Sequence, residues 1–282
     1  MFKIATWNVN SIRVRLDQVL GWLAEEQPDV LAVQETKIVD NGFPAAPFAE
    51  IGYLAAFVGE KTYNGVALLS KLPGEDIATH LPGSADPQRR LLAARYGALF
   101  VVNVYVPNGS EVGSDKYRYK LEWLARFEAY VRSCLAAGAP LIVLGDFNIA
   151  PEDRDVHDPV LWEGQVLVSP AERAAFRRLV EAGLADTFRL FEQEPRSFSW
   201  WDYRALAFRR NHGLRIDLIL ASPSLAARCA GCRIDKAPRR HPKPSDHTPV
   251  VAEFAWDPLN GKGVPPRGRA PGSSLRDSAV SR

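Results

Sequence analysis

Cysteine is scarce in this chain, which has 282 residues and only three cysteines. Cys134, Cys229 and Cys232 are too few, and odd in number, to build the disulfide framework of a small secreted domain. A chain of this length can bury a sizeable hydrophobic core without such bridges. We therefore expect a protein of the reducing cytoplasm.

Long apolar runs are also absent. The longest uncharged apolar stretches, such as residues 98–106, fall far below the ~20 residues that cross a bilayer. The first residues indicate a strand rather than the apolar segment of a secretion signal. We expect neither a membrane span nor a signal peptide.

A large net charge is lacking as well, because 35 basic residues oppose 33 acidic ones for a net charge of +2. Residues 204–243 hold ten basic residues and two acids, which suits either an anionic partner or a solvated basic face. Residues 257–282 hold five basic residues and two acids, a net +3, among many Gly, Pro and Ser. We expect this segment to be a disordered basic tail that follows a folded domain of residues 1–256.

Short runs rich in β-branched and aromatic residues predict strands. These runs lie at residues 2–9, 29–35, 53–59, 65–70, 98–106, 140–147, 216–221 and 249–256. Apolar residues at helical spacing predict helices over 14–26, 117–137 and 170–182. Several strands follow one another with no helix between them, which favours a mixed-sheet α/β sandwich over an alternating parallel fold.

Acidic and amide side chains recur at the ends of the predicted strands. With one histidine, they are Asn8, Glu35, Asp146, Asn148, Asp246 and His247. Each alone is better explained by a turn, a cap or a structural histidine. Because strand ends in a layered α/β structure share an edge, the set can converge on one site. Carboxylates with amide oxygens are the ligands that Mg²⁺ requires.

The order of the polar segments along the chain matches that of a known family. The segments are WNVNSIR, PDVLAVQETK, YNGVALLSK, VYVPNG, LGDFNIAP, FSWWDYR, GLRIDLILAS and KPSDHTPV. Through them, nearly all of residues 1–256 resembles the exonuclease III family of abasic-site DNA repair nucleases, in the endonuclease/exonuclease/phosphatase superfamily. The resemblance implies a four-layer α/β sandwich, with two mixed β-sheets packed face to face and helices outside.

A divalent metal at one end of the sandwich is also implied, Mg²⁺ with Mn²⁺ as a possible substitute. By position in these segments, Glu35 resembles the principal metal ligand. The other residues at or near the metal are Asn8, Asp146, Asn148, Asp246 and His247. Some relatives have an acidic residue where this chain has Asn10, so a second metal site is less secure.

The resemblance implies catalytic roles for Tyr105, Asp146, Asn148, Asp217 and His247. Asp146 orients or deprotonates the attacking water, and Asn148 orients Asp146 or the phosphate. Tyr105 donates to the phosphate. His247, oriented by Asp217, binds the scissile phosphate and offsets its developing charge.

The implied substrate is double-stranded DNA with abasic sites or blocked 3′ ends, and we expect a monomer. Trp200, Leu214 and Ile216 would wall a pocket for a flipped sugar without a base. Asn108 and Arg90 would contact phosphates, as would other basic residues such as Arg89, Lys37 and those of 204–215.

Other functions remain open from the residues. A non-catalytic nucleic-acid-binding regulator on this fold should have lost the acids and the histidine, which are all present. A superfamily phosphoesterase with a non-DNA substrate should lack the VYVPNG, FSWWDY and GLRID segments. A zinc site at Cys229, Cys232 and His241 lacks a fourth ligand.

Overall fold

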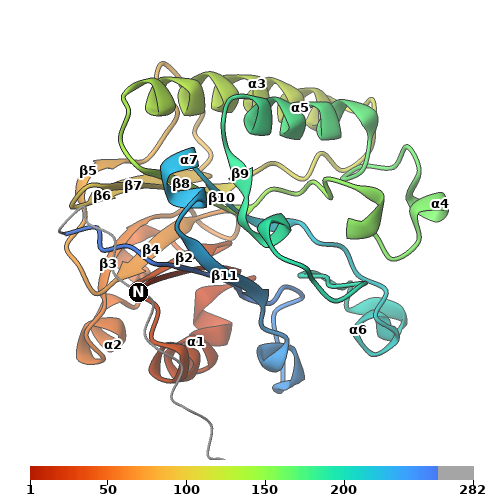
Figure 1. The fold of residues 1–282 in the computed structure, drawn as a ribbon. Coiled ribbons are helices and arrows are strands. Elements are labelled where there is room, and N and C mark those ends of the chain that lie inside the picture. The colour runs from red at the N-terminus through yellow and green to blue at the C-terminus, as the bar shows by residue number, and fades with distance from the viewer. Residues whose placement is uncertain (260–282) are drawn as a thin grey trace, which may run out of the picture.

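Two six-stranded β-sheets form the centre of the molecule, and helices cover their outer faces (Figure 1). The structure is a computed structural model that describes residues 1–259. The first sheet runs in the order β11 (Cys229–Ile234), β12 (Val250–Phe254), β1 (Phe2–Asn8), β2 (Val30–Gln34), β4 (Val66–Ser70) and β3 (Leu54–Val58). The second runs in the order β5 (Glu75–Ala78), β6 (Leu91–Tyr96), β7 (Leu99–Tyr105), β8 (Leu141–Asp146), β10 (Asp217–Ala221) and β9 (Ala185–Asp186).

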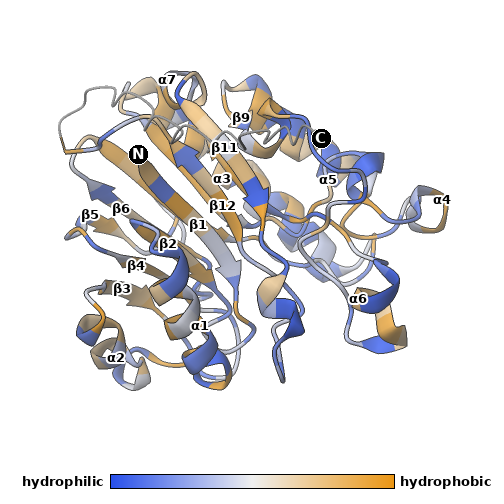
Figure 2. Ribbon diagram, turned by 60° about the horizontal axis from the view of Figure 1, so that its bottom comes forward, coloured by the Kyte–Doolittle hydropathy of each residue, from blue (hydrophilic) through white to orange (hydrophobic). Residues whose placement is uncertain are grey.

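Both sheets are mixed. β1 is parallel to β2, and β7 is parallel to β8, whereas β1 with β12 and β8 with β10 are antiparallel. The strands are mostly hydrophobic along their length (Figure 2), because both faces of each sheet are covered. The predicted four-layer sandwich is therefore confirmed.

The outer layers consist of helices with one apolar face each. α1 (Ile12–Glu26) and α2 (Ala45–Glu50) contribute Trp22, Leu23 and Phe48 to a core against the first sheet. α3 (Asp115–Ala136) and α5 (Pro170–Glu181) contribute Phe127 and Phe176 to a core against the second. Shorter helices are α4 (Pro159–Trp162), α6 (Ala207–Arg210) and α7 (Pro223–Ala226), and the 3₁₀ turns are η1 (Asp40–Gly42), η2 (Asp153–Asp155), η3 (Thr187–Leu190), η4 (Arg204–Leu206) and η5 (Ala237–Arg240).

One buried polar bridge crosses the apolar layer between the sheets. Gln34 of β2 donates through Nε2 to Asn103 Oδ1 of β7 at 2.7 Å, and Asn103 Nδ2 donates to the carbonyl oxygens of Val33 and Ala67. Gln34 and Asn103 are fully buried. Because buried polar groups are costly when unpaired, these bonds fix how one sheet lies over the other.

All eight predicted strand runs and all three predicted helices are present. β5, β6, β9 and β11 fall outside the predicted runs. β9 has two residues, β5 is largely exposed at a sheet edge, and β11 has a register shift between Cys229 and Gly231. None of the helices within residues 1–259 combines the length and the apolarity needed to cross a membrane. We expected a disordered tail over residues 257–282. Its residues 260–282 lie outside the part of the chain that the structure describes.

Candidate active site

Strand ends from both sheets meet at one place. Asn8 ends β1 and Glu35 follows β2, and the register pairs Asn8 with Gln34. In the second sheet Tyr105, Asp146 and Asp217 lie side by side on β7, β8 and β10. The convergence predicted from the sequence is therefore present, and it draws on each sheet about equally.

The backbone around these residues has unusual dihedral angles. Glu35 has φ 53° and Asn148 has φ 49°, both left-handed, which turn the chain sharply after β2 and β8. Gly145, with φ 144°, precedes Asp146. A Cβ there would lie 1.9 Å from the carbonyl oxygen of Val104, so the close approach of β8 to β7 requires glycine.

A single amide joins the two central carboxylates. Asn8 Nδ2 donates to Glu35 Oε1 at 2.8 Å and to Asp146 Oδ2 at 2.9 Å. Its Oδ1 accepts from the backbone N–H of Asn10. Asn8 is thus placed to hold Glu35 and Asp146 at a fixed separation, beside any metal that they bind.

His247 lies between two carboxylates. Its Nδ1 is 2.9 and 3.1 Å from the two oxygens of Asp217, and its Nε2 is 3.7 Å from Asp146 Oδ2. The 3.7 Å between His247 Nε2 and Asp146 Oδ2 is too long for a direct hydrogen bond, but it leaves Nε2 facing the same space as Asp146. Asp217 therefore orients the imidazole, in the arrangement that the resemblance implies.

Burial and neighbouring charges shift the pKa of Asp146 and the pKa of His247. Burial raises the pKa of the Asp146 carboxyl above its usual range, although His247 and the hydrogen bonds from Asn8 and Asn148 oppose the rise. Burial alone would lower the pKa of His247, but Asp217 and Asp146 raise it well above the usual histidine value. The imidazole is thereby kept positively charged next to a carboxylate, which suits a site for an anionic group.

Glu35, Asp146 and His247 form a group that could hold a metal ion. One ligand atom from each lies within 4.8 Å of the others. Within residues 1–259 this is the one such group of three or more, so Cys229, Cys232 and His241 do not form a comparable zinc site. Oxygen donors predominate in it, which fits a hard divalent cation.

Asp246 belongs to an adjoining hydrogen-bond network rather than to that group. It accepts from Trp200 Nε1 and Asn10 Nδ2, both at 3.0 Å. Asn10 Oδ1 in turn accepts from Lys37 Nζ, which also lies 2.7 Å from Glu35 Oε2. Lys37 is thus paired with a predicted metal ligand, a contact that no periodicity or spacing in the sequence signals.

Asn148 holds Asp146 with its backbone. Its N–H donates to Asp146 Oδ1 at 2.9 Å. Its side chain is engaged within the protein: Nδ2 donates to the Val106 carbonyl and Oδ1 accepts from Asn108 Nδ2, both at 3.0 Å. Asn108 itself is exposed to solvent.

Tyr105 is placed as a neutral donor. Burial, with the carboxylates of Glu35 and Asp146, holds its pKa far above the ordinary tyrosine value. Arg90 lies 4.8 Å from the Tyr105 ring centroid and donates to its carbonyl oxygen at 3.2 Å. Arg90 therefore supports Tyr105 as well as adding positive charge to the rim.

The predicted sugar-pocket residues lie together beside His247. Trp200 bridges to both Leu214 and His247 in backbone pairing, and Leu214 and Ile216 are buried. Trp200 is only half-buried and packs against the apolar cluster that contains Leu214 and Ile216. Its neighbour Trp201 is fully buried in a separate core cluster, so it has a packing role.

The basic residues of 204–215 are not equivalent. Arg209 and Arg210 are exposed on α6, and Arg204 is paired with Asp202. Arg215 is only 1% exposed, and its guanidinium forms buried ion pairs with Asp155 and Asp186. The expectation that it contacts DNA is therefore wrong, because its guanidinium is closed to solvent and bound to two carboxylates.

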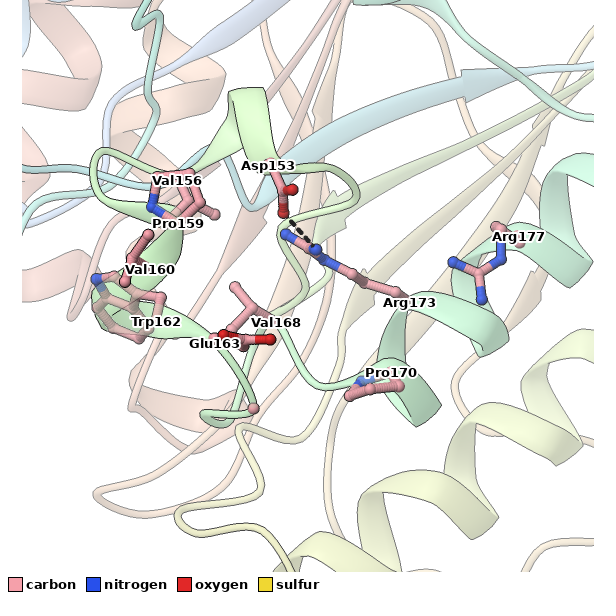
Figure 3. A pocket seen from close by; sticks show the side chains of 11 residues that line it. Asp153, Val156, Pro159, Val160, Trp162, Glu163, Val168, Pro170, Arg173 and Arg177 are labelled. Atoms are coloured by element: carbon pink, nitrogen blue, oxygen red, sulfur yellow. Dashed lines mark hydrogen bonds and ion pairs between the residues drawn. The ribbon is translucent and has the colours of Figure 1, made fainter.

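A cavity of about 460 Å³ lies elsewhere, between α4 and α5 (Figure 3). Arg173 points across it to an ion pair with Asp153, and Trp162 and Val160 form the apolar side. None of the residues predicted for catalysis or metal binding lines it. Two of its wall residues, Val156 and Val168, also belong to the cluster that supports Trp200.

Known proteins are similar to this chain over most of its length. The model of the Endonuclease/Exonuclease/phosphatase family matches residues 5–247. The chain is 36% identical over 265 residues to exodeoxyribonuclease III of Haemophilus influenzae, covering 89% of this chain and 99% of the relative.

Two solved structures are similar over most of both chains. One is a 3′ phosphatase from Neisseria bound to a product DNA hairpin, with a TM-score of 0.89 and 44% identity over 91% of this chain and 100% of that one. The other is an AP endonuclease from Archaeoglobus fulgidus, with a TM-score of 0.87 and 42% identity over 90% and 99%.

Proposed function

Because the chain belongs to the Endonuclease/Exonuclease/phosphatase family, we propose that it is a metal-dependent DNA repair phosphodiesterase. It cleaves duplex DNA 5′ to abasic sites and removes nucleotides or blocking groups from 3′ ends. The observation that carries the proposal is the group of Glu35, Asp146 and His247, with ligand atoms within 4.8 Å. The exodeoxyribonuclease, 3′ phosphatase and AP endonuclease relatives support DNA as the substrate.

Each residue of the centre has a distinct task. The Asp146 carboxylate, fixed by Asn8 and by the Asn148 N–H, orients the attacking water and accepts its proton. The His247 imidazolium, fixed by Asp217, binds a non-bridging phosphate oxygen through Nε2. Tyr105 donates its phenolic hydrogen to the phosphate.

The donor set fits Mg²⁺, with Mn²⁺ as a substitute. Glu35 is the principal ligand, since its side chain is 15% exposed at the mouth of the site, and Asp146 is the second. Asn8, Asn148 and Asp246 would hold waters of the ion, and His247, as an imidazolium with no free lone pair, faces the phosphate rather than the cation. When bound, the ion stabilises charge on the phosphate and on the departing oxygen.

One arrangement serves several substrates. Attack in line with the leaving 3′ oxygen cuts the strand and leaves a 3′ hydroxyl. The same attack at a duplex 3′ end releases a nucleotide or a terminal phosphate. Trp200, Leu214 and Ile216 give the sugar pocket apolar walls, which favour a sugar without a base.

We further propose that residues 1–256 are the catalytic domain and that the protein acts as a monomer in the cytoplasm. The family match over residues 5–247 supports the extent of the domain. Three free cysteines, none of them in a disulfide, support a reducing compartment. Gel filtration with light scattering tests the monomer directly.

The function is tested on labelled duplex DNA. One substrate carries a single tetrahydrofuran abasic analogue and a 5′ label, and a second ends in a 3′ phosphate. Each is incubated with the protein and Mg²⁺, with and without EDTA, beside the Asp146→Asn variant. We expect EDTA-sensitive cleavage 5′ to the analogue and release of phosphate from the second duplex. Binding without cleavage of either would contradict the proposal and favour a regulator.

A further inference from the structure

A buried lysine lies directly behind the site. Lys120 of α3 is 0% exposed, and its Nζ donates to the carbonyl oxygens of Asn108 at 3.0 Å and Asn148 at 2.6 Å. The third partner is the Glu172 carboxylate of α5. An ammonium group has three hydrogens to donate, so Lys120 is fully engaged.

Glu172 is engaged just as fully. One carboxylate oxygen also accepts from the Leu167 N–H, and the other accepts from the N–H and the hydroxyl of Ser169. A buried ion pair adds little net stability compared with apolar side chains of similar volume. Stability alone therefore does not explain this pair, whereas the position of its two carbonyl partners does.

The two carbonyl groups belong to residues that are connected to Asp146 by hydrogen bonds. Asn108 follows β7 and Asn148 follows β8, and their side chains are hydrogen-bonded to each other. Asn148 also has a left-handed backbone, and its N–H holds Asp146 Oδ1. A left-handed non-glycine residue persists only where its surroundings hold it, and the Lys120 bond to its carbonyl does so.

We propose that Lys120, braced by Glu172, is a positioning residue for phosphoester cleavage. It locks the backbones of Asn108 and Asn148 together, so that the Asn148 N–H aims Asp146 at the water. The kinetic part of this proposal rests on the proposed function. Lys120 does not touch the substrate.

The chain offers a matched control on the same two helices. Arg178 of α5 binds Glu128 of α3 at 2.7 Å, away from the site and partly exposed. Lys120→Met and Arg178→Met each remove one cation that ties α3 to α5. Because an error of about 1 Å in a reacting group can cost ~10²-fold, we expect Lys120→Met to slow single-turnover cleavage at least about 10-fold. Arg178→Met should retain the wild-type rate.

Binding and coupling separate positioning from general damage. Duplex affinity comes mostly from phosphate contacts, so it should stay close to wild type in Lys120→Met. Since Lys120 acts through the aim of the Asp146 carboxylate, Lys120→Met should slow an Asp146→Asn protein far less than it slows the wild type. Multiplicative losses in this pair would overturn the proposal.

A readout without activity keeps the two proposals apart. Hydrogen exchange followed by mass spectrometry should show faster exchange in Lys120→Met at residues 106–114 and 147–152, and no such change in Arg178→Met. If Lys120→Met does not fold, the double variant Lys120→Met/Glu172→Gln, which leaves no unpaired buried charge, takes its place. Failure of the wild type to cleave DNA would refute the proposed function, while unchanged exchange in both segments would refute the role of Lys120.

Discussion

Replacing Asp146 and His247 by asparagine, singly and together, tests whether they serve one chemical step. Asp146 accepts from Asn8 Nδ2 and from the Asn148 N–H, each at 2.9 Å and each on a different oxygen. An asparagine keeps one acceptor and turns its NH₂ towards the other donor. The loss of one hydrogen bond to a charged group costs ~1.5–3 kcal/mol, which a domain of typical stability survives.

The effect on turnover should be much larger than the effect on folding. Asp146→Asn removes the group that accepts the proton, which costs ~10²-fold or more. His247→Asn removes one donor to the developing charge, on the scale of ~3–4 kcal/mol, or roughly 10²–10³-fold. Independent effects would multiply to ~10⁴-fold or more. Because both residues face one space, with 3.7 Å between His247 Nε2 and Asp146 Oδ2, the double variant should fall well short of that product.

The assay is single-turnover cleavage of the abasic duplex in Mg²⁺, beside filter binding in Ca²⁺. Asp235→Asn is the matched control, since Asp235 also accepts two hydrogen bonds on different oxygens, from Trp22 Nε1 and the Ala237 N–H, outside the site. It should match Asp146→Asn in stability but not in rate. Strictly multiplicative losses, or an Asp146→Asn protein that binds poorly and cleaves normally once saturated, would refute the common centre.

Other predictions concern the metal, the pocket and the fold. Glu35→Ala should cut cleavage by orders of magnitude and raise the Mg²⁺ concentration needed, because each lost carboxylate weakens the hold on the cation; an unchanged Mg²⁺ titration would remove Glu35 from the ligand set. Trp200→Ala should reduce discrimination between abasic and intact duplex more than it reduces general binding, and equal losses in competition assays would indicate packing alone. Gly145→Ala should lower the thermal midpoint sharply, since its Cβ would lie 1.9 Å from the Val104 oxygen, and a midpoint like that of the wild type would contradict that contact.

Local signals in the sequence account well for the elements that position the site. The helix predicted over 14–26 is Ile12–Glu26, and it ends just before Pro28 at Gln27, whose backbone is left-handed. The helix predicted over 170–182 is Pro170–Glu181, which begins with a capping box between Ser169 and Glu172. Strands and their ends can be recognised from short segments of sequence. The polar residues at those ends therefore predicted that their side chains converge on one site.

Contacts between distant segments could not be predicted in this way. Lys120 lies in a helix rich in charged residues, and only the packing of α3 on α5 shows that it is buried. Gln34 and Asn103 are 69 residues apart, and the local sequence around each indicates only an ordinary polar residue in a strand. Arg215 was counted with exposed basic residues, although its carboxylate partners lie 29 and 60 residues away. Charge and hydropathy do not specify such partners.

The order of the strands along the chain has a consequence for biosynthesis. All strands of the second sheet lie between residues 75 and 221, whereas the first sheet combines residues 2–70 with residues 229–254. A chain made from its N-terminus can thus complete the second sheet while β1 still lacks its neighbour β12. His247 leaves the ribosome after Glu35 and Asp146, just ahead of that last strand. A nascent chain stalled before His247 would therefore carry carboxylates for a cation but no imidazole for a phosphate, so the ability to cut DNA would arise only once His247 has been made.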